Sequence, residues 1–229
     1  YNFDTFGTVS DCLEKTFNMK LLFTFLTITS FSFISFGQQS SQVVLDNLSK
    51  KMKSHTSFYI EFSASTENKS TGTNTSDTGK GWVKNNKFFA SFGDNTIISN
   101  AAKTWTIVKE EKSVYESDAE EDDDIINPRK LMTIWEDGFK NKYGKETTLS
   151  GETVHQILLY PKDPGSVEYH TIILYISKMK NELKKVTIRS KDGTVLTYIL
   201  KKYTPNPEIS DSKFVFNAKK YPGYTVIKD

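Results

Sequence analysis

The sequence predicts a mainly β protein with helices, in which a strongly curved antiparallel sheet forms an incomplete, open β-barrel. Apolar and polar residues alternate in many short segments, which is the pattern of half-buried strands. Roughly ten such segments follow at the spacing of an antiparallel meander, a number that suits an open barrel. Helical spacing is confined to two segments. The chain has 229 residues, 37% of them hydrophobic, which is enough for one well-buried core, so we expect one domain.

The N-terminal region has the pattern of an export signal. Lys20 precedes an apolar run at 21–36 that ends in Gly37. This order is typical of a secretory signal peptide, so we expect residues 19–37 to be a signal peptide that is cleaved after Gly37. The alternative is a membrane anchor, which is disfavoured because the run is short and diluted with Ser and Thr.

The division of the rest of the chain follows from that signal. Residues 1–18 show no targeting pattern, and we interpret them as an upstream extension, which leaves 38–229 as a single exported domain. The only cysteine, Cys12, precedes the signal, and Gln38 stands where a lipid-anchored protein has its cysteine. The net charge of +2 is too small to indicate a nucleic-acid binder. We therefore expect a monomer that is free in solution and has no disulfide.

The exported domain is expected to begin with a helix and a hairpin. Apolar residues from Val43 to Met52 recur at helical spacing and predict an amphipathic helix over 41–55. From Phe58 the period changes to two, which predicts the first strand. Residues 67–78 contain almost no apolar side chain, so they predict a polar hairpin loop before the strand returns.

The remaining strands are predicted to be short and regularly spaced. A hairpin turn at Lys191-Asp192-Gly193 separates two of them. The expected strands are 96–99, 104–108, 113–115, 154–160, 171–176, 183–189, 194–201, 213–216 and 225–227.

One segment interrupts the strands. An acidic run at 116–124 leads into a predicted helix over 127–139, where Asn127 caps the first amides and Pro128 is pre-shaped for the first turn. The acidic run lacks the glycine and terminal glutamate of an EF-hand, so we interpret it as a solvated loop rather than a calcium site. Three apolar residues share one side of this helix: Leu131, Ile134 and Trp135.

Catalytic and metal-binding patterns are missing from the exported domain. Its histidines, His55, His155 and His170, are scattered, and none has the spacing of a metal site. The sequence has no glycine-rich phosphate loop after a strand, no Gly-x-Ser-x-Gly elbow and no cysteine nucleophile in this domain. We therefore expect neither an enzyme nor a bound cofactor or metal.

The segment at 79–92, GKGWVKNNKFFASF, carries large aromatic residues on both parities of a predicted hairpin. A half-solvated strand would carry them on one parity only. Either both faces of the sheet pack against filled cores, or one face packs and the other lines a covered hollow for a ligand. Composition alone favours neither.

An ordered set of segments resembles the LolA family of periplasmic lipoprotein carriers over nearly all of 38–229. The segments are FYIEFSAST at 58–66, GKGWVKNNKFF at 79–89, AAKTWTIV at 101–108, the helix that starts at Pro128, KDGTVLTYILKKY at 191–203, FVF at 214–216 and YPGYTVIKD at 221–229. The resemblance implies an open antiparallel barrel with a helical lid over a hydrophobic cavity. In such carriers this cavity holds the acyl chains of outer-membrane lipoproteins.

The resemblance also implies a location and partners. A LolA-like carrier is periplasmic, takes acylated lipoproteins from an inner-membrane ABC transporter and passes them to an outer-membrane acceptor. The family commonly has Arg-Pro where this chain has Asn85-Asn86. That Arg latches the lid, so Asn85 is the latch candidate here, although it lacks the charge of Arg.

Acyl chains cost about 0.8 kcal/mol per CH₂ to expose to water, so a carrier must enclose them in side chains without polar demands. The candidate acyl-binding residues are Phe62, Trp82, Phe89, Trp105, Leu131 and Trp135. The chief alternative function is an envelope sensory or structural binding module, with the same half-barrel and a protein or another lipid as ligand.

Overall fold

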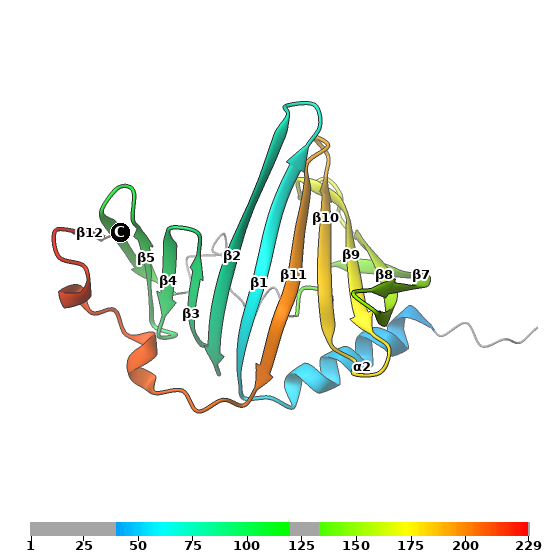
Figure 1. The fold of residues 1–229 in the computed structure, drawn as a ribbon, viewed down its shortest axis with the longest axis horizontal. Helices are drawn as coiled ribbons and strands as arrows, with labels where there is room; N and C mark the ends of the chain where they lie inside the picture. The colour runs from blue at the N-terminus through cyan, green and yellow to red at the C-terminus, as the bar shows by residue number, and fades with distance from the viewer. Residues whose placement is uncertain (1–39, 120–132, 229) are drawn as a thin grey trace, which may run out of the picture. The chain divides into compact units, whose positions relative to one another are not determined.

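The computed structural model describes residues 40–119 and 133–228, and in them the chain is mainly β. These residues form one α-helix and a twelve-stranded sheet (Figure 1). The expected signal peptide and upstream extension, Leu131 and most of the acidic run lie outside the described residues.

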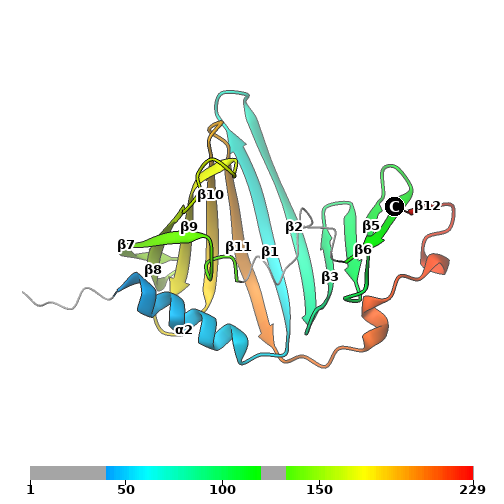
Figure 2. The same ribbon diagram turned by 180° about the vertical axis from the view of Figure 1, so that it is seen from behind.

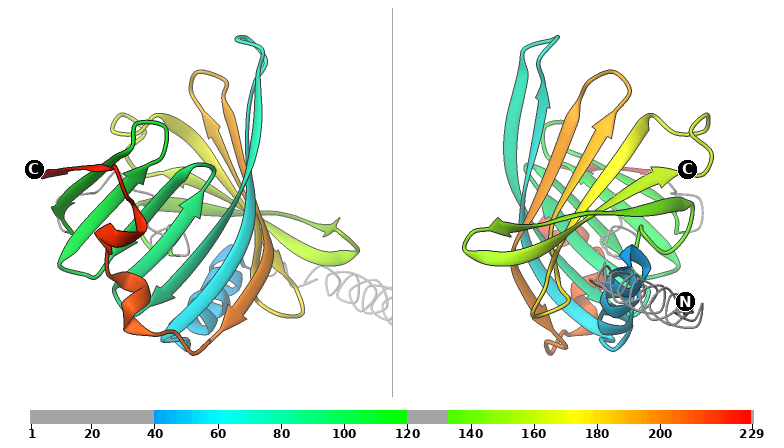
Figure 3. Two further views of the ribbon diagram at one scale, coloured as in Figure 1. Left: turned by 60° about the vertical axis from the view of Figure 1, so that its left-hand side comes forward. Right: turned by 90° about the vertical axis from the view of Figure 1, so that its right-hand side faces the viewer.

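The sheet is open and almost entirely antiparallel. Its strand order is β12-β6-β5-β4-β3-β2-β1-β11-β10-β9-β8-β7, and only the β12–β6 pair is parallel. The sheet curves strongly, and its two edge strands do not pair with each other (Figure 3). The predicted class, a mainly β protein with an open curved sheet and a helix, is confirmed. The strands are β1 Ser57–Asn68, β2 Thr73–Lys84, β3 Lys87–Phe92, β4 Asn95–Ser99, β5 Lys103–Val108, β6 Ser113–Asp118, β7 Phe139–Leu149, β8 Glu152–Pro161, β9 Tyr169–Ser177, β10 Leu183–Ser190, β11 Val195–Pro205 and β12 Thr225–Lys228.

The helix α2, Ser41–Lys53, covers part of one face of the sheet, which we call the inner face (Figure 2). The helix begins where the Ser40 side chain accepts a hydrogen bond from the Val43 amide, an N-cap of the usual kind. Four apolar side chains at helical spacing are buried against the sheet: Val44, Leu45, Leu48 and Met52. The expected helix is confirmed, with its end at Lys53 rather than at 55.

The first hairpin is longer than expected. Residues 67–78 are not a polar loop, because β1 and β2 pair continuously from Ser57↔Lys84 to Asn68↔Thr73 and leave a short turn at 69–72. The error has a physical reason. Backbone hydrogen bonds hold a ladder together without apolar side chains, and threonine has a good strand propensity.

Three further expectations about secondary structure were wrong. The strand β7 was not predicted. It lies at the edge of the sheet, alternate residues along it are exposed, and it contains few apolar side chains. Residues 133–138 form turns and bends, so the predicted helix does not extend to 139, and its earlier part lies outside the described residues. The predicted strand at 213–216 is replaced by a short 3-10 helix, η1 Asp211–Phe214.

The chain after β11 covers part of the opposite, outer face of the sheet. It contains η1, a second 3-10 turn, η2 Ala218–Lys220, and finally β12, which pairs with β6. Figure 3 shows this segment beside β3 to β6. It packs on a small cluster of buried residues, Ile98, Trp105, Ile107 and Val114, which is separate from the main core beneath α2.

Candidate functional site

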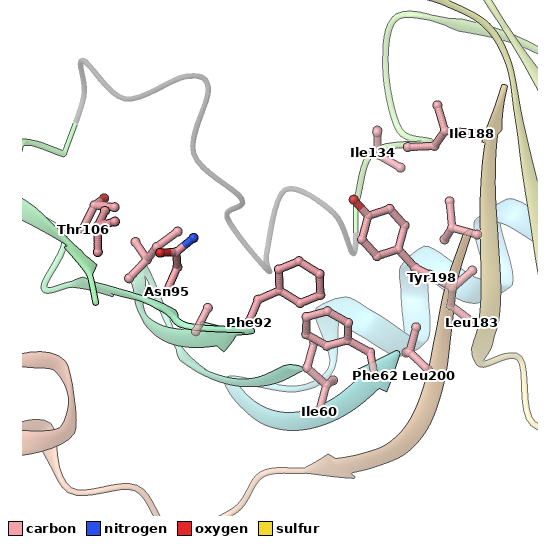
Figure 4. Close-up of a pocket in the computed structure, with 14 residues that line it drawn as sticks. Ile60, Phe62, Phe92, Asn95, Thr106, Ile134, Leu183, Ile188, Tyr198 and Leu200 are labelled. Carbon is pink, nitrogen blue, oxygen red and sulfur yellow. The ribbon is translucent and has the colours of Figure 1, made fainter. Parts of the chain in front are cut away.

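An apolar pocket of about 170 Å³ lies on the inner face, next to the part of the sheet that α2 covers. Figure 4 shows side chains from both halves of the curved sheet pointing into it. The fourteen lining residues are Ile60, Phe62, Ala90, Phe92, Asn95, Ile97, Thr106, Val108, Ile134, Leu183, Val186, Ile188, Tyr198 and Leu200.

The alternation of side chains along each strand places these residues together. Ile60 and Phe62 share one face of β1, and the β1–β2–β3 register brings Ala90 and Phe92 to the same face. Antiparallel pairing extends this face across β4 and β5 in one direction and β11 and β10 in the other. The pocket therefore spans seven neighbouring strands in the sheet order, from β5 to β10.

Gly79 on β2 makes room for the ring of Phe62. A Cβ atom at position 79 would lie 2.3 Å from Cζ of Phe62, so no other residue fits there unless the ring moves. The ring of Phe62 is stacked against that of Phe92, with 5.9 Å between centroids and 14° between planes. Gly79 thus sets the position that Phe62 takes in the pocket.

The lining of the pocket is uncharged among the described residues. Only Asn95, Thr106 and Tyr198 contribute polar side-chain atoms to it. Burial raises the pKa of Tyr198, so its hydroxyl stays protonated at neutral pH. A pocket of this kind holds an apolar ligand and offers it a few neutral hydrogen-bonding groups.

The segment at 133–138 forms one wall of the pocket through Ile134. The neighbouring Trp135 is 5% exposed, packs in the main core and donates a hydrogen bond from its indole nitrogen to Ser49 Oγ at 2.8 Å. Lys53 and Glu136 add an ion pair of 3.0 Å between helix and segment. Trp135 therefore fixes the wall to α2 without lining the pocket itself.

The six candidate acyl-binding residues lie in different places. Phe62 lines the pocket. Trp82, Phe89 and Trp105 have the opposite parity and lie on the outer face, where Trp82 contacts Tyr59 and Phe89 with ring centroids 4.6 and 5.5 Å away. Trp135 is buried beside the pocket, and Leu131 lies outside the described residues.

The outer-face rings pack against the C-terminal segment. Trp105 stacks on Phe216 at 6.1 Å and donates a hydrogen bond to Glu116 at 3.1 Å. Lys213 places its ammonium group 3.5 Å from the centroid of Trp82 and 4.4 Å from that of Phe89. These rings pack on the outer face, whereas Phe92 of the same segment borders the inner-face pocket.

The latch candidate Asn85 occupies the tight turn between β2 and β3. Its φ angle is 54°, in the left-handed region that asparagine tolerates better than most residues. Its backbone amide donates a hydrogen bond to the carbonyl of Thr56 at 2.9 Å. This geometry accounts for an asparagine at the turn independently of any lid contact.

Sequence reasoning missed most of the pocket. Phe92, Ile97 and Leu200 are smaller or less conspicuous than the tryptophans, but all three have the same parity as Phe62 once the strands are paired. Following the parity of Phe62 through the hairpins would have identified them. The choice of the largest rings instead selected residues from the outer face.

The described residues contain no cluster of side chains that could hold a metal ion. No group of three or more His, Cys, Asp or Glu side chains gathers in residues 40–119 or 133–228. His155 is bonded to the Tyr143 hydroxyl at 2.9 Å, and His55 to that of Tyr203 at 2.7 Å. Within the same residues, no helix has the length and apolar content to cross a membrane.

A solved structure from Thermus thermophilus supports the fold. An uncharacterized conserved protein from Thermus thermophilus has a TM-score of 0.55 at 13% identity, with 83% of this chain and 100% of that chain covered. A LolA superfamily protein from Nitrosomonas europaea has a TM-score of 0.41 at 11% identity and covers 77% of this chain and 98% of its own. The Pseudomonas aeruginosa MucA/MucB complex gives 0.40 at 12% identity, with 78% and 62% covered.

No curated protein matches the chain. A family match does exist, and it extends over residues 53–217, from the end of α2 to the C-terminal segment. The matched region includes every residue that lines the pocket. The family is described as outer membrane lipoprotein carrier protein LolA, and this chain belongs to it.

Proposed function

We propose that the protein is a periplasmic carrier that binds the acyl chains of lipoproteins in the inner-face pocket and carries them from the inner membrane towards the outer membrane. The observation that carries this proposal is the pocket itself, whose described lining is uncharged and apolar apart from three neutral polar groups. Membership of the LolA family supports the same function.

The physical chemistry of the pocket fits this cargo. Each CH₂ group left in water costs about 0.8 kcal/mol, so an acyl chain needs an enclosure of carbon atoms during an aqueous crossing. A charged cargo group would be desolvated without a partner in this lining. The acyl-binding set that we propose keeps Phe62 and adds the other apolar lining residues in place of the outer-face rings.

The proposal also covers the export of the protein and the partners between which it carries lipoproteins. Export relies on residues 19–37 as a signal peptide, with an inner-membrane ABC transporter supplying the lipoprotein and an outer-membrane acceptor receiving it. N-terminal sequencing of the exported protein is expected to begin at or within a few residues of Gln38. Recovery of Tyr1 on that protein would contradict the signal peptide.

A pair of neighbouring substitutions tests the binding site. Leu200 lines the pocket, whereas Ile199 is a half-buried residue of the same strand with the opposite parity, opposite Lys185. Leu200→Glu is expected to abolish binding of a triacylated lipoprotein, because the carboxylate would face acyl chains without a partner. Ile199→Glu is expected to leave binding intact.

The assay compares uptake of an acylated lipoprotein with uptake of the same protein lacking its acylated cysteine. Equal uptake by Leu200→Glu and the parent, at equal thermal stability, would show that the pocket is not the acyl site. Native mass spectrometry of the protein purified from its own periplasm tests the alternative function. A co-purifying triacylated lipoprotein supports carriage, and a protein-only complex would favour a sensory or structural module.

A further inference from the structure

Two stacked rings lie in the middle of the pocket lining. Phe62 and Phe92 lie between residues of β4–β5 on one side and residues of β10–β11 on the other (Figure 4). Tyr198 flanks the stack, with its ring centroid 6.4 Å from that of Phe62. We call the stack the partition, and it separates two parts of the pocket that differ in chemistry.

The part over β10–β11, the apolar lobe, is lined almost entirely by carbon. Its residues are Ile134, Leu183, Val186, Ile188, Leu200 and the flanking Tyr198. The part over β4–β5, the polar lobe, contains Asn95 and Thr106 beside Ile97 and Val108. Asn95 is exposed to solvent, so the polar lobe is the end of the pocket that water reaches.

The two rings of the partition differ in freedom. Phe62 is confined by the backbone of β2, since its ring lies directly over Gly79. Phe92 is the last residue of β3 and is half-buried, and it is followed by Gly93 with a φ angle of 54° in the turn to β4. Phe92 is therefore the ring that can rotate away with the least disturbance of the core.

We propose that the Phe62–Phe92 partition sets the length of acyl chain that the pocket accepts, and that the ligand is a neutral acyl ester or amide held with its head at Asn95 and Thr106. This inference rests on the proposed acyl-binding function. The ligand's carbonyl accepts a hydrogen bond from the Asn95 amide or the Thr106 hydroxyl, and a chain long enough to displace Phe92 extends past the partition into the apolar lobe.

The size of the pocket agrees with a partition that is closed. Its volume of about 170 Å³ is below the roughly 300–1,000 Å³ of typical ligand pockets. A short chain ends at the partition, and a long chain requires Phe92 to move. The neutral head follows from the lining, because no described lining residue has a positive charge to pair with a carboxylate or phosphate.

A series of monoacylglycerols of increasing chain length, each below its micelle concentration, tests this assignment by displacement of a fluorescent apolar probe. Phe92→Ala is expected to bind the longer members about tenfold more tightly than the parent protein, a gain of about 1.4 kcal/mol. The matched control is Val108→Ala, which enlarges the polar lobe and leaves the stack in place. It is expected to keep the parent's preference for chain length.

The head group is tested with the same probe. The free fatty acid of a given length is expected to bind more weakly than its monoacylglycerol, and Asn95→Leu is expected to reduce that difference. An unchanged chain-length profile in Phe92→Ala would overturn the partition. Tighter binding of the fatty acid would overturn the neutral head. A parent protein that takes up neither the lipids nor an acylated lipoprotein would instead refute the proposed function.

Discussion

The inner and outer faces of β2 to β5 are both apolar, yet the protein treats them differently. On the outer face, Trp105 is buried in a small core under the C-terminal segment, and the half-buried Trp82 lies under Lys213 of that segment. On the inner face, Phe92 and Ile97 of the same strands border a pocket that the described chain leaves open. Within β2 to β5, the largest rings therefore lie on the face that the protein's own chain covers.

The difference follows from what each face must do. A core that only stabilises the fold gains from large rings at close-packed density. A face that binds a flexible chain gains from smaller apolar side chains with space between them. Within β2 to β5, substitutions of the outer-face rings are therefore expected to lower the free energy of unfolding more than substitutions of the pocket residues, which are expected to change ligand binding.

The largest expected effect is a difference in unfolding free energy between a substitution on the outer face and one on the inner face. Trp105→Ala removes a side chain that is 8% exposed, with its stack on Phe216 and its bond to Glu116. Urea unfolding is expected to show a loss of about 3–5 kcal/mol. Ile97→Ala in the pocket is expected to cost about 1 kcal/mol, because Ile97 already borders unfilled space. Equal losses would mean that the inner face is packed as tightly as the outer one.

Acid is expected to weaken the packed end of the inner face, near β7 to β9. His155 is 2% exposed and bonded to Tyr143, and burial lowers its pKa, although Glu146 opposes this shift and Lys178 adds to it. The unfolded state then binds more protons than the folded state, so stability falls as the pH drops below about 6.5. In thermal melts recorded over a pH series, His155→Gln is expected to reduce the fall in melting temperature below that pH. An unchanged fall would mean that other groups cause it.

A smaller effect is expected where the C-terminal segment meets the outer face. Lys213→Met puts an uncharged side chain of similar length at this position and so removes the charge over Trp82 and Phe89. Because a cation over aromatic rings contributes about 0.5–2 kcal/mol, we expect a loss of about 1 kcal/mol in urea unfolding. Lys219→Met, at an exposed position of the same segment, is the control and should be neutral. A neutral Lys213→Met would show that the rings alone hold the segment.

The smallest expected effect concerns the turn residue Asn85. Asn85→Arg is expected to lower stability by about 1 kcal/mol, because its φ angle of 54° disfavours most side chains. If Asn85 also latches the lid, the Arg form closes more tightly through charge-assisted hydrogen bonds and delivers lipoprotein to the acceptor more slowly. Asn85→Gly keeps the turn and removes the side chain. Equal transfer rates in all three proteins would limit Asn85 to the turn.

The sequence was sufficient for the fold and insufficient for the site. Alternation from Phe58 onward and the helical spacing up to Met52 were strong enough to place most strands and α2. The site depends on which apolar face is left open, and that is decided by a distant C-terminal segment around Phe216. No local pattern in 79–92 contains that information, so the outer-face rings were assigned to the pocket.

The parallel pairing of β12 with β6 has a consequence for the rate of folding. The two strands are far apart in the chain, so their pairing must overcome a large loop-closure entropy before any of its contacts form. This edge of the sheet is therefore expected to form late, and until then β6 and the outer rings remain exposed to other chains. Pulsed hydrogen exchange during refolding should show protection of Val226 and Ile227 after that of β1, and earlier protection would argue against this order.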